Sequence, residues 1–167
     1  MGKRLLITGG LGFIASSFIR QFVDQYEIGI IDSLTYASDM KRIPNPLWQQ
    51  INFYNKDVTN LEDMLTIVGA FKPDLILHMA SETHVDNSIK NPHVFLQTNI
   101  TGTLNMLIAS LRYNVEKFIN ISTDEVYGES KNWLDVKSEE SPLLPGSPYS
   151  VSKASADMLG QSYNRMY

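Results

Sequence analysis

Short apolar runs recur along the chain and predict the strands of a buried sheet. Residues 5–7, 28–31 and 75–79 are apolar almost throughout, as is typical of strands whose two faces are both covered. Residues 51–54 alternate between apolar and polar side chains, and residues 115–122 continue the series. We therefore expect five strands, enough for one central sheet.

Between these strands the apolar residues recur at helical spacing. Residues 13–22 and 61–70 each place their apolar side chains on one helical face, and a longer helical pattern covers residues 92–111. Residues 148–167 predict a last helix. Pro148 suits its first turn, because a proline there gives up no helical hydrogen bond.

Strands that alternate with helices predict βαβ units, right-handed crossovers and a parallel sheet. The polar stretches 33–50 and 123–147 predict loops, the first with a short helix. The expected fold class is α/β, a Rossmann-like doubly wound parallel sheet, with residues 1–167 forming one domain. Because no sixth strand follows residues 148–167, we expect this domain to be incomplete and truncated before a substrate domain.

The turn after the first strand carries a dinucleotide-binding fingerprint. Gly9, Gly12 and Ala15 are spaced three apart between a buried strand and a helix. Gly9 would let the chain turn sharply, Gly12 would let the backbone approach a pyrophosphate, and Ala15 would let helix and strand pack closely. N–H groups that are free at the helix start would face the anion. The alternative is a tight turn without a ligand, since such turns need glycine for steric reasons alone.

Asp32 strengthens the dinucleotide interpretation. It ends the second strand, twenty residues after Gly12, where a carboxylate accepts hydrogen bonds from an adenosine ribose. A carboxylate at this place also repels a 2′-phosphate, which favours NAD over NADP.

Polar stretches follow the strands at residues 9–12, 32–36, 80–88 and 122–128. Because ligands of open parallel sheets bind beyond the carboxyl ends of the strands, we expect these stretches to converge on one cleft. His84 and Asp86, within the third stretch, are interpreted as loop residues without a direct role.

Two groups of residues in the second half are candidates for chemistry. Tyr149 and Lys153 are four apart, so they are neighbours on one helix face. A fixed ammonium would stabilise the phenolate and lower the tyrosine pKa toward the range of a useful base. The triplet Thr123-Asp124-Glu125 follows the fifth strand, and two carboxyl groups in unlike environments can divide acid and base roles. The alternatives are a solvated helix face for the first pair, and a helix cap or solvated loop for the triplet.

The composition excludes several classes of function. The chain has no cysteine, which excludes disulfides, thiolate metal sites and cysteine nucleophiles. Its three histidines show no metal-ligand spacing, so we expect no metal. A net charge of −4 without a basic run argues against a nucleic-acid partner. No apolar run approaches the ~18 residues of a membrane span, and the first strand begins too early for a signal peptide, so we expect no membrane contact and a cytoplasmic location.

Taken together, the motifs resemble those of a known family. The segments TGGLGFIAS, DSLTYA, MASETHVDNSI, STDEVYG and YSVSK are similar to those of the extended short-chain dehydrogenase/reductases and, within them, of the dTDP-glucose 4,6-dehydratases. The likeness runs from residue 4 to residue 167. Ala15 departs from the family's usual glycine, and the chain is much shorter than family members.

The resemblance implies NAD as the cofactor and assigns residues to it. These are Gly9, Gly12, Phe13 and Ile14 at the pyrophosphate, Asp32 at the adenosine ribose with Leu34 and Thr35 nearby, Asp57 and Val58 at the adenine, and Ala80, Ser81, Thr98 or Asn99, Tyr149 and Lys153 on the ribose–nicotinamide side.

The resemblance also implies an enzyme, a lyase that converts dTDP-glucose to dTDP-4-keto-6-deoxyglucose by internal hydride transfer from C4 to C6. The candidate catalytic residues are Thr123, Asp124, Glu125, Tyr149 and Lys153. Tyr149 would take the proton of the 4-hydroxyl, to which Thr123 would hydrogen-bond. Glu125 would remove the C5 proton and Asp124 would protonate the departing 6-hydroxyl.

The implied partners are a nucleotide sugar and a second copy of the chain. In the family, the helices predicted here near residues 93–113 and 148–167 pack across a two-fold axis, which predicts a homodimer. Two alternatives stay open. The chain could be another NAD-dependent nucleotide-sugar epimerase or dehydratase, or a catalytically silent NAD-binding module that lacks the pocket for the sugar.

Overall fold

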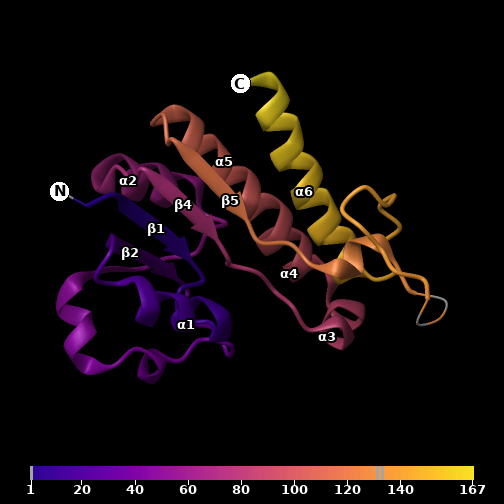
Figure 1. Cartoon of the computed structure of the whole chain (residues 1–167), viewed down its shortest axis with the longest axis horizontal. Coiled ribbons are helices and arrows are strands. Elements are labelled where there is room, and N and C mark those ends of the chain that lie inside the picture. The colour runs from indigo at the N-terminus through magenta and orange to yellow at the C-terminus, as the bar shows by residue number, and fades with distance from the viewer. Residues whose placement is uncertain (1, 131, 133) are drawn as a thin grey trace.

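Five parallel strands form the sheet at the centre of the computed structural model, which describes residues 2–130, 132 and 134–167. They are β1 (Arg4–Thr8), β2 (Glu27–Asp32), β3 (Ile51–Asn55), β4 (Leu75–His78) and β5 (Lys117–Asn120). Their order across the sheet is β3-β2-β1-β4-β5, so the chain winds outward from β1 in both directions (Figure 1). The predicted doubly wound parallel sheet is confirmed.

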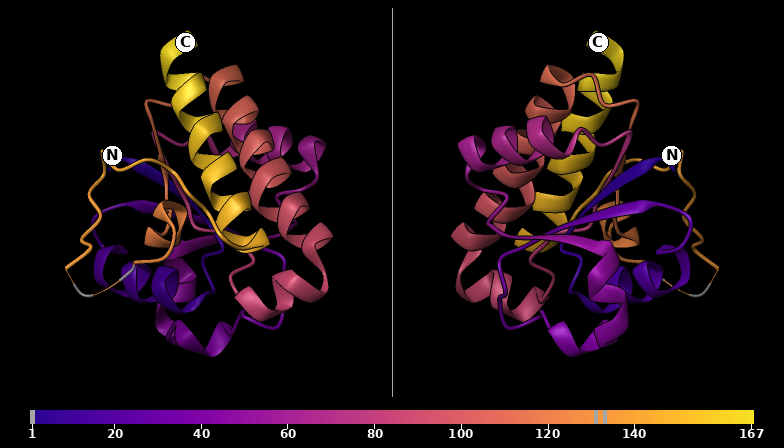
Figure 2. Two further views of the ribbon diagram at one scale, coloured as in Figure 1. Left: turned by 90° about the vertical axis from the view of Figure 1, so that its right-hand side faces the viewer. Right: turned by 90° about the vertical axis from the view of Figure 1, so that its left-hand side faces the viewer.

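Both faces of the sheet are covered by helices (Figures 1 and 2). Helix α1 (Phe13–Phe22) covers one face, and α2 (Leu61–Phe71), α5 (Gly102–Arg112) and α6 (Pro148–Met166) lie on the other. Two short helices, α3 (Val85–Lys90) and α4 (Pro92–Phe95), lie near the carboxyl ends of the strands. The carboxyl ends are therefore the open edge, where the loops meet.

Successive side chains of β1 belong to different cores. Leu5 and Ile7 pack with Ile19 of α1, whereas Leu6 packs with Met64 of α2. All five of these side chains are at most 4% exposed, as the period of two in a strand requires when both faces are covered. This explains why the strands read as unbroken apolar runs.

The predicted helix over residues 92–111 is divided in the structure. A π-helical turn, Leu96–Thr101, separates α4 from α5. Such wide turns are rare and often lie at functional sites, and hydrophobic spacing alone does not reveal them. The loop expected at Asp86 is also wrong, because Asp86 belongs to α3, whose six residues are too few to show a helical period.

Helix α6 begins where the sequence predicts. Ser147 is its N-cap, Pro148 occupies the first turn, and the side chains and backbone N–H groups of Ser147 and Ser150 bond one another reciprocally. This fixes the start of the helix and therefore the height of Tyr149 above the sheet. None of the helices in the described part of the chain combines the length and hydropathy of a bilayer span.

Candidate active site

The glycine turn after β1 lies directly against the end of β4. Gly9 has φ +65°, and a Cβ atom at this position would come within 2.8 Å of the Ala80 backbone, so both conformation and space require glycine. A Cβ at Gly12 would meet only the Gly9 carbonyl within 4 Å, which leaves the outer side of the turn open. Gly10, which the sequence does not single out, has a packing role, since its Cβ would lie 2.6 Å from Ile30.

Asp32 holds the turn and the following loop in place. Its side chain is buried, and one carboxylate oxygen accepts a hydrogen bond from the Leu11 N–H at 2.9 Å. The other oxygen accepts bonds from the Leu34 N–H at 2.9 Å and the Ser38 hydroxyl at 2.6 Å. A carboxylate has about four acceptor positions, so Asp32 keeps capacity for one further donor.

A cleft of about 180 Å³ opens at the carboxyl ends of the strands. It is lined by most of the residues predicted to hold the cofactor, namely Gly9, Gly12, Asp32, Thr35, Asp57, Val58, Ala80, Ser81 and Thr98. Ser38, Lys56 and Glu82 line it as well and were not predicted. Of the four stretches expected to converge, residues 9–12, 32–36 and 80–88 contribute to this cleft, together with residues 56–58 after β3. No residue of the fourth stretch, 122–128, lines it.

Five of the residues predicted to hold the cofactor do not line this cleft, namely Phe13, Ile14, Leu34, Tyr149 and Lys153, and neither does Asn99, the alternative to Thr98. The side chains of Phe13 and Ile14 are 80% and 66% exposed, so only their backbone N–H groups, in the first turn of α1, remain as candidates for an anion. Leu34 is partly exposed, and its N–H is already bonded to Asp32. Leu34 has a φ of +55°, and in this conformation its N–H points to the Asp32 carboxylate.

Asn105 supports the far end of the cleft and was missed by the sequence prediction. It lies on α5, where its side chain donates hydrogen bonds to the carbonyls of Val58 at 3.0 Å and Thr59 at 2.9 Å. The Thr59 N–H in turn donates to Asp57. The available signal was a polar residue on the buried face of a helix, which needs a partner once it is removed from water.

Tyr149 and Lys153 occupy the first turns of α6, and both are buried. The Tyr149 ring stands edge-on to Phe95, with the ring centres 6.4 Å apart. The Lys153 ammonium donates a hydrogen bond to the Ile121 carbonyl at 2.6 Å, just beyond β5. Burial lowers the pKa of Lys153, and the Asp157 carboxylate one turn further opposes that effect. The helix thus carries a fixed cation beside a buried phenol.

The triplet Thr123-Asp124-Glu125 reaches the same place from β5. Thr123 caps a short 3-10 helix, Asp124–Tyr127, and its hydroxyl accepts a bond from the Glu125 N–H at 3.3 Å. Both carboxylates are exposed, and their charges act on the Tyr149 phenol. Residues more than twenty positions apart in the sequence therefore face one another.

The predicted lowering of the Tyr149 pKa is wrong for the protein alone. Burial raises the pKa of Tyr149 above its usual value, a hydrogen bond from Thr123 lowers it, and the charges of Glu125 and Asp124 raise it. Removing a phenolate from water outweighs the nearby donor. The Lys153 ammonium, which was expected to stabilise the phenolate, is bound to the Ile121 carbonyl instead.

Asn99 joins the cleft to α6. Its side-chain oxygen accepts bonds from the Ser81 hydroxyl and the Glu82 N–H, and its amide donates to the Glu82 carbonyl. The same amide donates to the Ser152 hydroxyl of α6 at 2.8 Å. Asn99 lies in the π-helical turn, and Ser152, which was not predicted, lies between Tyr149 and Lys153.

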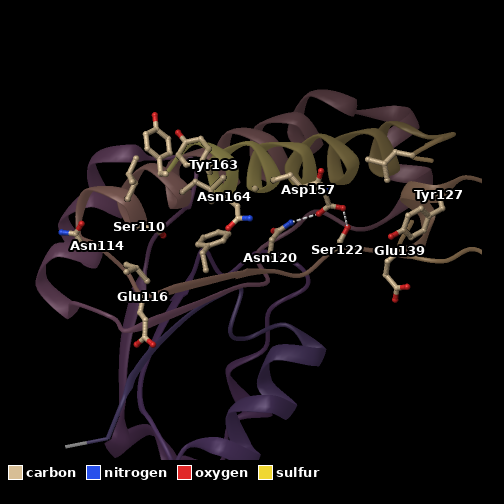
Figure 3. Close-up of a pocket in the computed structure, with 18 of the residues that line it drawn as sticks. Ser110, Asn114, Glu116, Asn120, Ser122, Tyr127, Glu139, Asp157, Tyr163 and Asn164 are labelled. Carbon is tan, nitrogen blue, oxygen red and sulfur yellow. Dashed lines mark hydrogen bonds between the residues drawn. The ribbon is translucent and has the colours of Figure 1, made fainter. Parts of the chain in front are cut away.

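A larger hollow of about 910 Å³ lies along β5, α5 and α6, and Figure 3 shows the polar side chains that line it. We call it the β5–α6 groove. Asn120 donates to Asp157 at 2.9 Å, and the Ser122 hydroxyl also donates to Asp157 (Figure 3). No predicted site residue lines this groove, so size alone does not identify the site.

The chain is similar in sequence to proteins named as nucleotide-sugar enzymes. The family model described as GDP-mannose 4,6 dehydratase matches residues 6–167. The dTDP-glucose 4,6-dehydratase of Streptomyces antibioticus is 38% identical over 173 residues, which cover 98% of this chain and 49% of that protein. The enzyme of the same name from Mycobacterium tuberculosis is 39% identical over 170 residues, with 98% and 50% covered. The chain thus spans about half the length of these relatives.

Two solved structures are also similar. One is DesIV, a dTDP-glucose 4,6-dehydratase from Streptomyces venezuelae with NAD bound, at a TM-score of 0.88, 38% identity, and coverage of 98% of this chain and 52% of that one. The other is the UDP-Glc/GlcNAc 4-epimerase of Campylobacter jejuni, at a TM-score of 0.91, 31% identity, and coverage of 98% and 50%.

Proposed function

The chain belongs to the GDP-mannose 4,6-dehydratase family, and from that membership we propose that it binds NAD and supplies the catalytic residues of a nucleotide-sugar 4,6-dehydratase. The resemblance expected from the motifs is thereby confirmed at the level of the family. One observation carries the proposal: the Asp124–Tyr127 turn packs against α6, so that the charges of Asp124 and Glu125 act on the buried phenol of Tyr149. Oxidation of an alcohol by hydride transfer needs a base for the hydroxyl proton, which a phenolate can be, and loss of water needs an acid and a base beside it.

The cleft fits NAD in three respects. The open side of Gly12 and the first N–H groups of α1 suit a pyrophosphate. The remaining acceptor position of Asp32 suits a ribose hydroxyl, and its charge disfavours a 2′-phosphate. Asp57 and Val58 line the end proposed for the adenine. When bound, NAD would take hydride from C4 of the sugar and return it at C6.

Tyr149 would act first, by accepting the proton of the 4-hydroxyl while Thr123 hydrogen-bonds the same oxygen. Because burial and two carboxylates raise the pKa of Tyr149, the phenolate needs a nearby cation. An ammonium has three donors, and the bond of Lys153 to Ile121 uses one of them. Lys153 would therefore hold the phenolate once the proton has moved.

Glu125 and Asp124 would carry out the elimination. The 4-ketone acidifies the C5 hydrogen, so Glu125 can remove it as a proton, and Asp124 can protonate the 6-hydroxyl, which leaves as water. Both carboxyl groups are adjacent in the Asp124–Tyr127 turn and exposed toward the open edge. Exposure suits them, because each exchanges a proton with the sugar or with solvent in every cycle.

The substrate we propose is dTDP-glucose, on the strength of the dehydratase relatives at 38% and 39% identity. The likeness to the UDP-Glc/GlcNAc 4-epimerase favours a second candidate, a 4-epimerase. Epimerisation needs the phenol and the cofactor but not the removal of water. Asp124 and Glu125 therefore distinguish the two candidates.

Deuterium at C4 of dTDP-glucose tests the reaction. The protein encoded by the complete reading frame should convert this substrate to a 4-keto-6-deoxy sugar with the deuterium at C6. Mass spectrometry and NMR detect the position of the deuterium. Deuterium that returns to C4 of a dTDP-galactose product would identify an epimerase and overturn the dehydratase. UDP-glucose and GDP-mannose, tested in parallel, assign the nucleotide.

Binding of NAD to the 167-residue chain, followed by calorimetry, tests the cofactor separately from the reaction. Binding without any turnover in the complete protein would identify a catalytically silent NAD-binding module. NADP should bind at least about tenfold more weakly, because Asp32 repels its extra phosphate. Equal affinity for both cofactors would contradict the role proposed for Asp32.

We also propose that the working form is a homodimer that packs through α5 and α6. Leu111, Val151 and Met158 on these helices are between 42% and 54% exposed, which supports an apolar interface. Light scattering gives the mass. If the complete protein is also a monomer at micromolar concentration, the homodimer is overturned.

A further inference from the structure

His78 is a buried histidine that the proposed reaction does not use. It ends β4, opposite Thr8 at the end of β1, and it is 2% exposed. Its Nδ1 lies 2.7 Å from the Thr8 hydroxyl, and its Nε2 lies 3.0 Å from the Thr103 hydroxyl of α5. Both ring nitrogens therefore bind hydroxyl groups that come from different elements.

The direction of these hydrogen bonds follows from counting donors. The Thr8 oxygen accepts bonds from the N–H groups of Met79 and Ala80, each at 3.1 Å. A hydroxyl has two lone pairs and one hydrogen, so the remaining Thr8 hydrogen must point at Nδ1 of His78. Nδ1 is then an acceptor, and the ring proton of the neutral histidine is on Nε2.

The series of hydrogen bonds continues in the same direction on the other side of the His78 ring. The Nε2–H group donates to Thr103, and the Thr103 hydroxyl donates to the Asn99 carbonyl at 2.7 Å. Burial and the charge of Lys153 lower the pKa of His78 to about 3, which agrees with a neutral ring. From Thr8 through His78 to Thr103, each hydroxyl and the ring N–H donate to one acceptor, which gives this part of the series one direction. The Met79 N–H is shared between the Thr8 hydroxyl and the Thr8 carbonyl at 3.2 Å.

The two ends of this series lie at the two halves of the candidate site. At one end, Thr8 fixes the Ala80 N–H, and the Ala80 backbone is in tight contact with the glycine turn at Gly9. At the other end, Asn99 binds Ser152, whose hydroxyl donates to the Tyr149 carbonyl at 2.6 Å. The ring of His78 links the two ends, in addition to the Asn99 side chain, which binds Ser81 and Glu82. The backbone adds a bond from the Ile121 N–H to the His78 carbonyl at 3.1 Å.

We propose that His78, as the Nε2–H tautomer, is a positioning residue that sets the glycine turn and the Tyr149 helix at a fixed distance, so that a cofactor held by the one is in register with the phenol of the other. This inference rests on the proposed function. Its structural core, the tautomer and the two hydroxyl partners, does not.

Two substitutions separate the two halves of the link. In His78→Asn, the amide can take the place of Nδ1 and bind Thr8, but it does not reach Thr103. In His78→Gln, the amide nitrogen can take the place of Nε2 and donate to Thr103, while the Thr8 hydroxyl loses its acceptor. We expect His78→Gln to weaken NAD binding about tenfold with kcat little changed. His78→Asn should keep the NAD Kd within about threefold and lower kcat at least about tenfold.

Thr103 provides the conservative rescue. Thr103→Ser keeps the hydroxyl and should retain wild-type kcat, whereas Thr103→Val should reproduce the loss of kcat seen in His78→Asn. The matched control is Ser110→Ala, which removes a buried hydroxyl bonded only to the Met106 carbonyl within α5. The inference would be overturned if both His78 variants showed the same rise in NAD Kd and the same fall in kcat. It would also be overturned if both variants kept the wild-type Kd and kcat.

Nitrogen NMR of the histidine rings tests the tautomer in the 167-residue chain without cofactor or substrate. The His78 signal should show a protonated Nε2 and an unprotonated Nδ1 at pH 7, with the exposed rings of His84 and His93 as references. A proton on Nδ1 would overturn the inference whatever the activity shows. Wild-type protein with the expected tautomer but no NAD binding would instead overturn the proposed function alone.

Discussion

Asn99 and Asn120 are the same residue type in two different regions, and their surroundings differ. Asn99, at the cleft, uses all its side-chain hydrogen-bonding groups, with partners Ser81, Glu82 and Ser152. Asn120, in the β5–α6 groove, donates to Asp157, while its buried carbonyl oxygen has no partner among the described residues. The cleft is a completed polar network, and the groove is not.

The difference teaches how to choose between two hollows. The groove is the larger, yet one of its buried polar atoms lacks a partner among the described residues, and none of the residues predicted to hold the cofactor lines it. The cleft is smaller, but buried polar side chains hold its backbone segments in position, as Asp32 holds the glycine turn and Asn99 holds Glu82. A site that must hold a ligand accurately needs that kind of support, because it fixes the geometry before the ligand arrives.

Asn99→Leu should have the largest effect on stability. Leucine matches the size of asparagine but leaves the Glu82 backbone and the Ser152 hydroxyl without their partners. We expect a loss of about 4 kcal/mol in the free energy of unfolding, measured by urea denaturation. Asn164→Leu, at an exposed position of α6, is the control and should change the stability by no more than about 0.5 kcal/mol. If the two variants lose similar amounts of unfolding free energy, the hydrogen bonds of Asn99 contribute no more to stability than an exposed residue does.

Acid should destabilise the cleft through His78. The pKa of His78 is about 3 in the folded protein and about 6.5 in the unfolded chain. Below pH 6.5 the His78 side chain therefore binds a proton in the unfolded chain but stays neutral in the folded protein. The contribution of His78 to the free energy of unfolding is complete above pH 6.5 and declines as the pH falls toward 3. The expected loss is about 2 kcal/mol between pH 7 and pH 5.

Urea denaturation at pH 7, 6 and 5 measures this loss, and His78→Gln provides the reference because glutamine does not titrate. The wild-type stability should fall more steeply than that of the variant, whereas His93→Gln, at an exposed position, should follow the wild type. Parallel curves for wild type and His78→Gln would contradict the prediction.

Asp157 lies in the groove but acts on the cleft, so its replacement sharpens the comparison. Its charge raises the pKa of Lys153, against the lowering by burial. In Asp157→Asn that support is lost, so the Lys153 pKa should fall further and the ammonium should lose its proton at a lower pH. If the reaction needs that ammonium, the alkaline limb of the pH dependence of kcat shifts toward neutral pH. We then expect kcat at pH 8 to fall about threefold, which corresponds to about 0.6 kcal/mol in activation free energy.

A pH profile of the complete protein measures this shift. Glu116→Gln is the matched control, because Glu116 also lines the groove but pairs with Lys3 at the far end of β5. An alkaline limb that stays in place in Asp157→Asn would show that the groove and the cleft are electrostatically independent.

Most of the fold could be predicted because hydrophobic spacing records burial directly. Each strand of the sheet shows as an apolar or alternating run, and the cap at Ser147 and Pro148 marks the start of α6. The π-helical turn and α3 could not be predicted, since both interrupt or shorten the helical period on which the prediction depends. The residues lining the cleft were largely predicted, because parallel strands bring their carboxyl ends together.

The supporting network could not be predicted in the same way. Thr8 and His78 are single polar residues at the ends of apolar runs, and Thr103 is one of several polar residues between 97 and 105. The bonds that join them to one another span 25 and 70 positions of the sequence. Their pairing depends on the register of β1 against β4 and on the π-helical turn. The pKa of Tyr149 was predicted in the wrong direction for a related reason, since burial is a property of the fold and not of the Tyr149–Lys153 spacing.

Asn120→Leu should have the smallest effect, and it tests the comparison from the side of the groove. The substitution removes a buried carbonyl oxygen that has no partner among the described residues, which is favourable, and it also removes the hydrogen bond to Asp157, which is unfavourable. These contributions oppose each other, and Ser122 still donates to Asp157, so the free energy of unfolding should change by no more than about 0.5 kcal/mol. Urea denaturation beside Asn99→Leu gives the difference between the two regions directly. A loss as large as that in Asn99→Leu would mean that Asn120 belongs to a network as complete as the one at the cleft, and the distinction between the two regions would then fail.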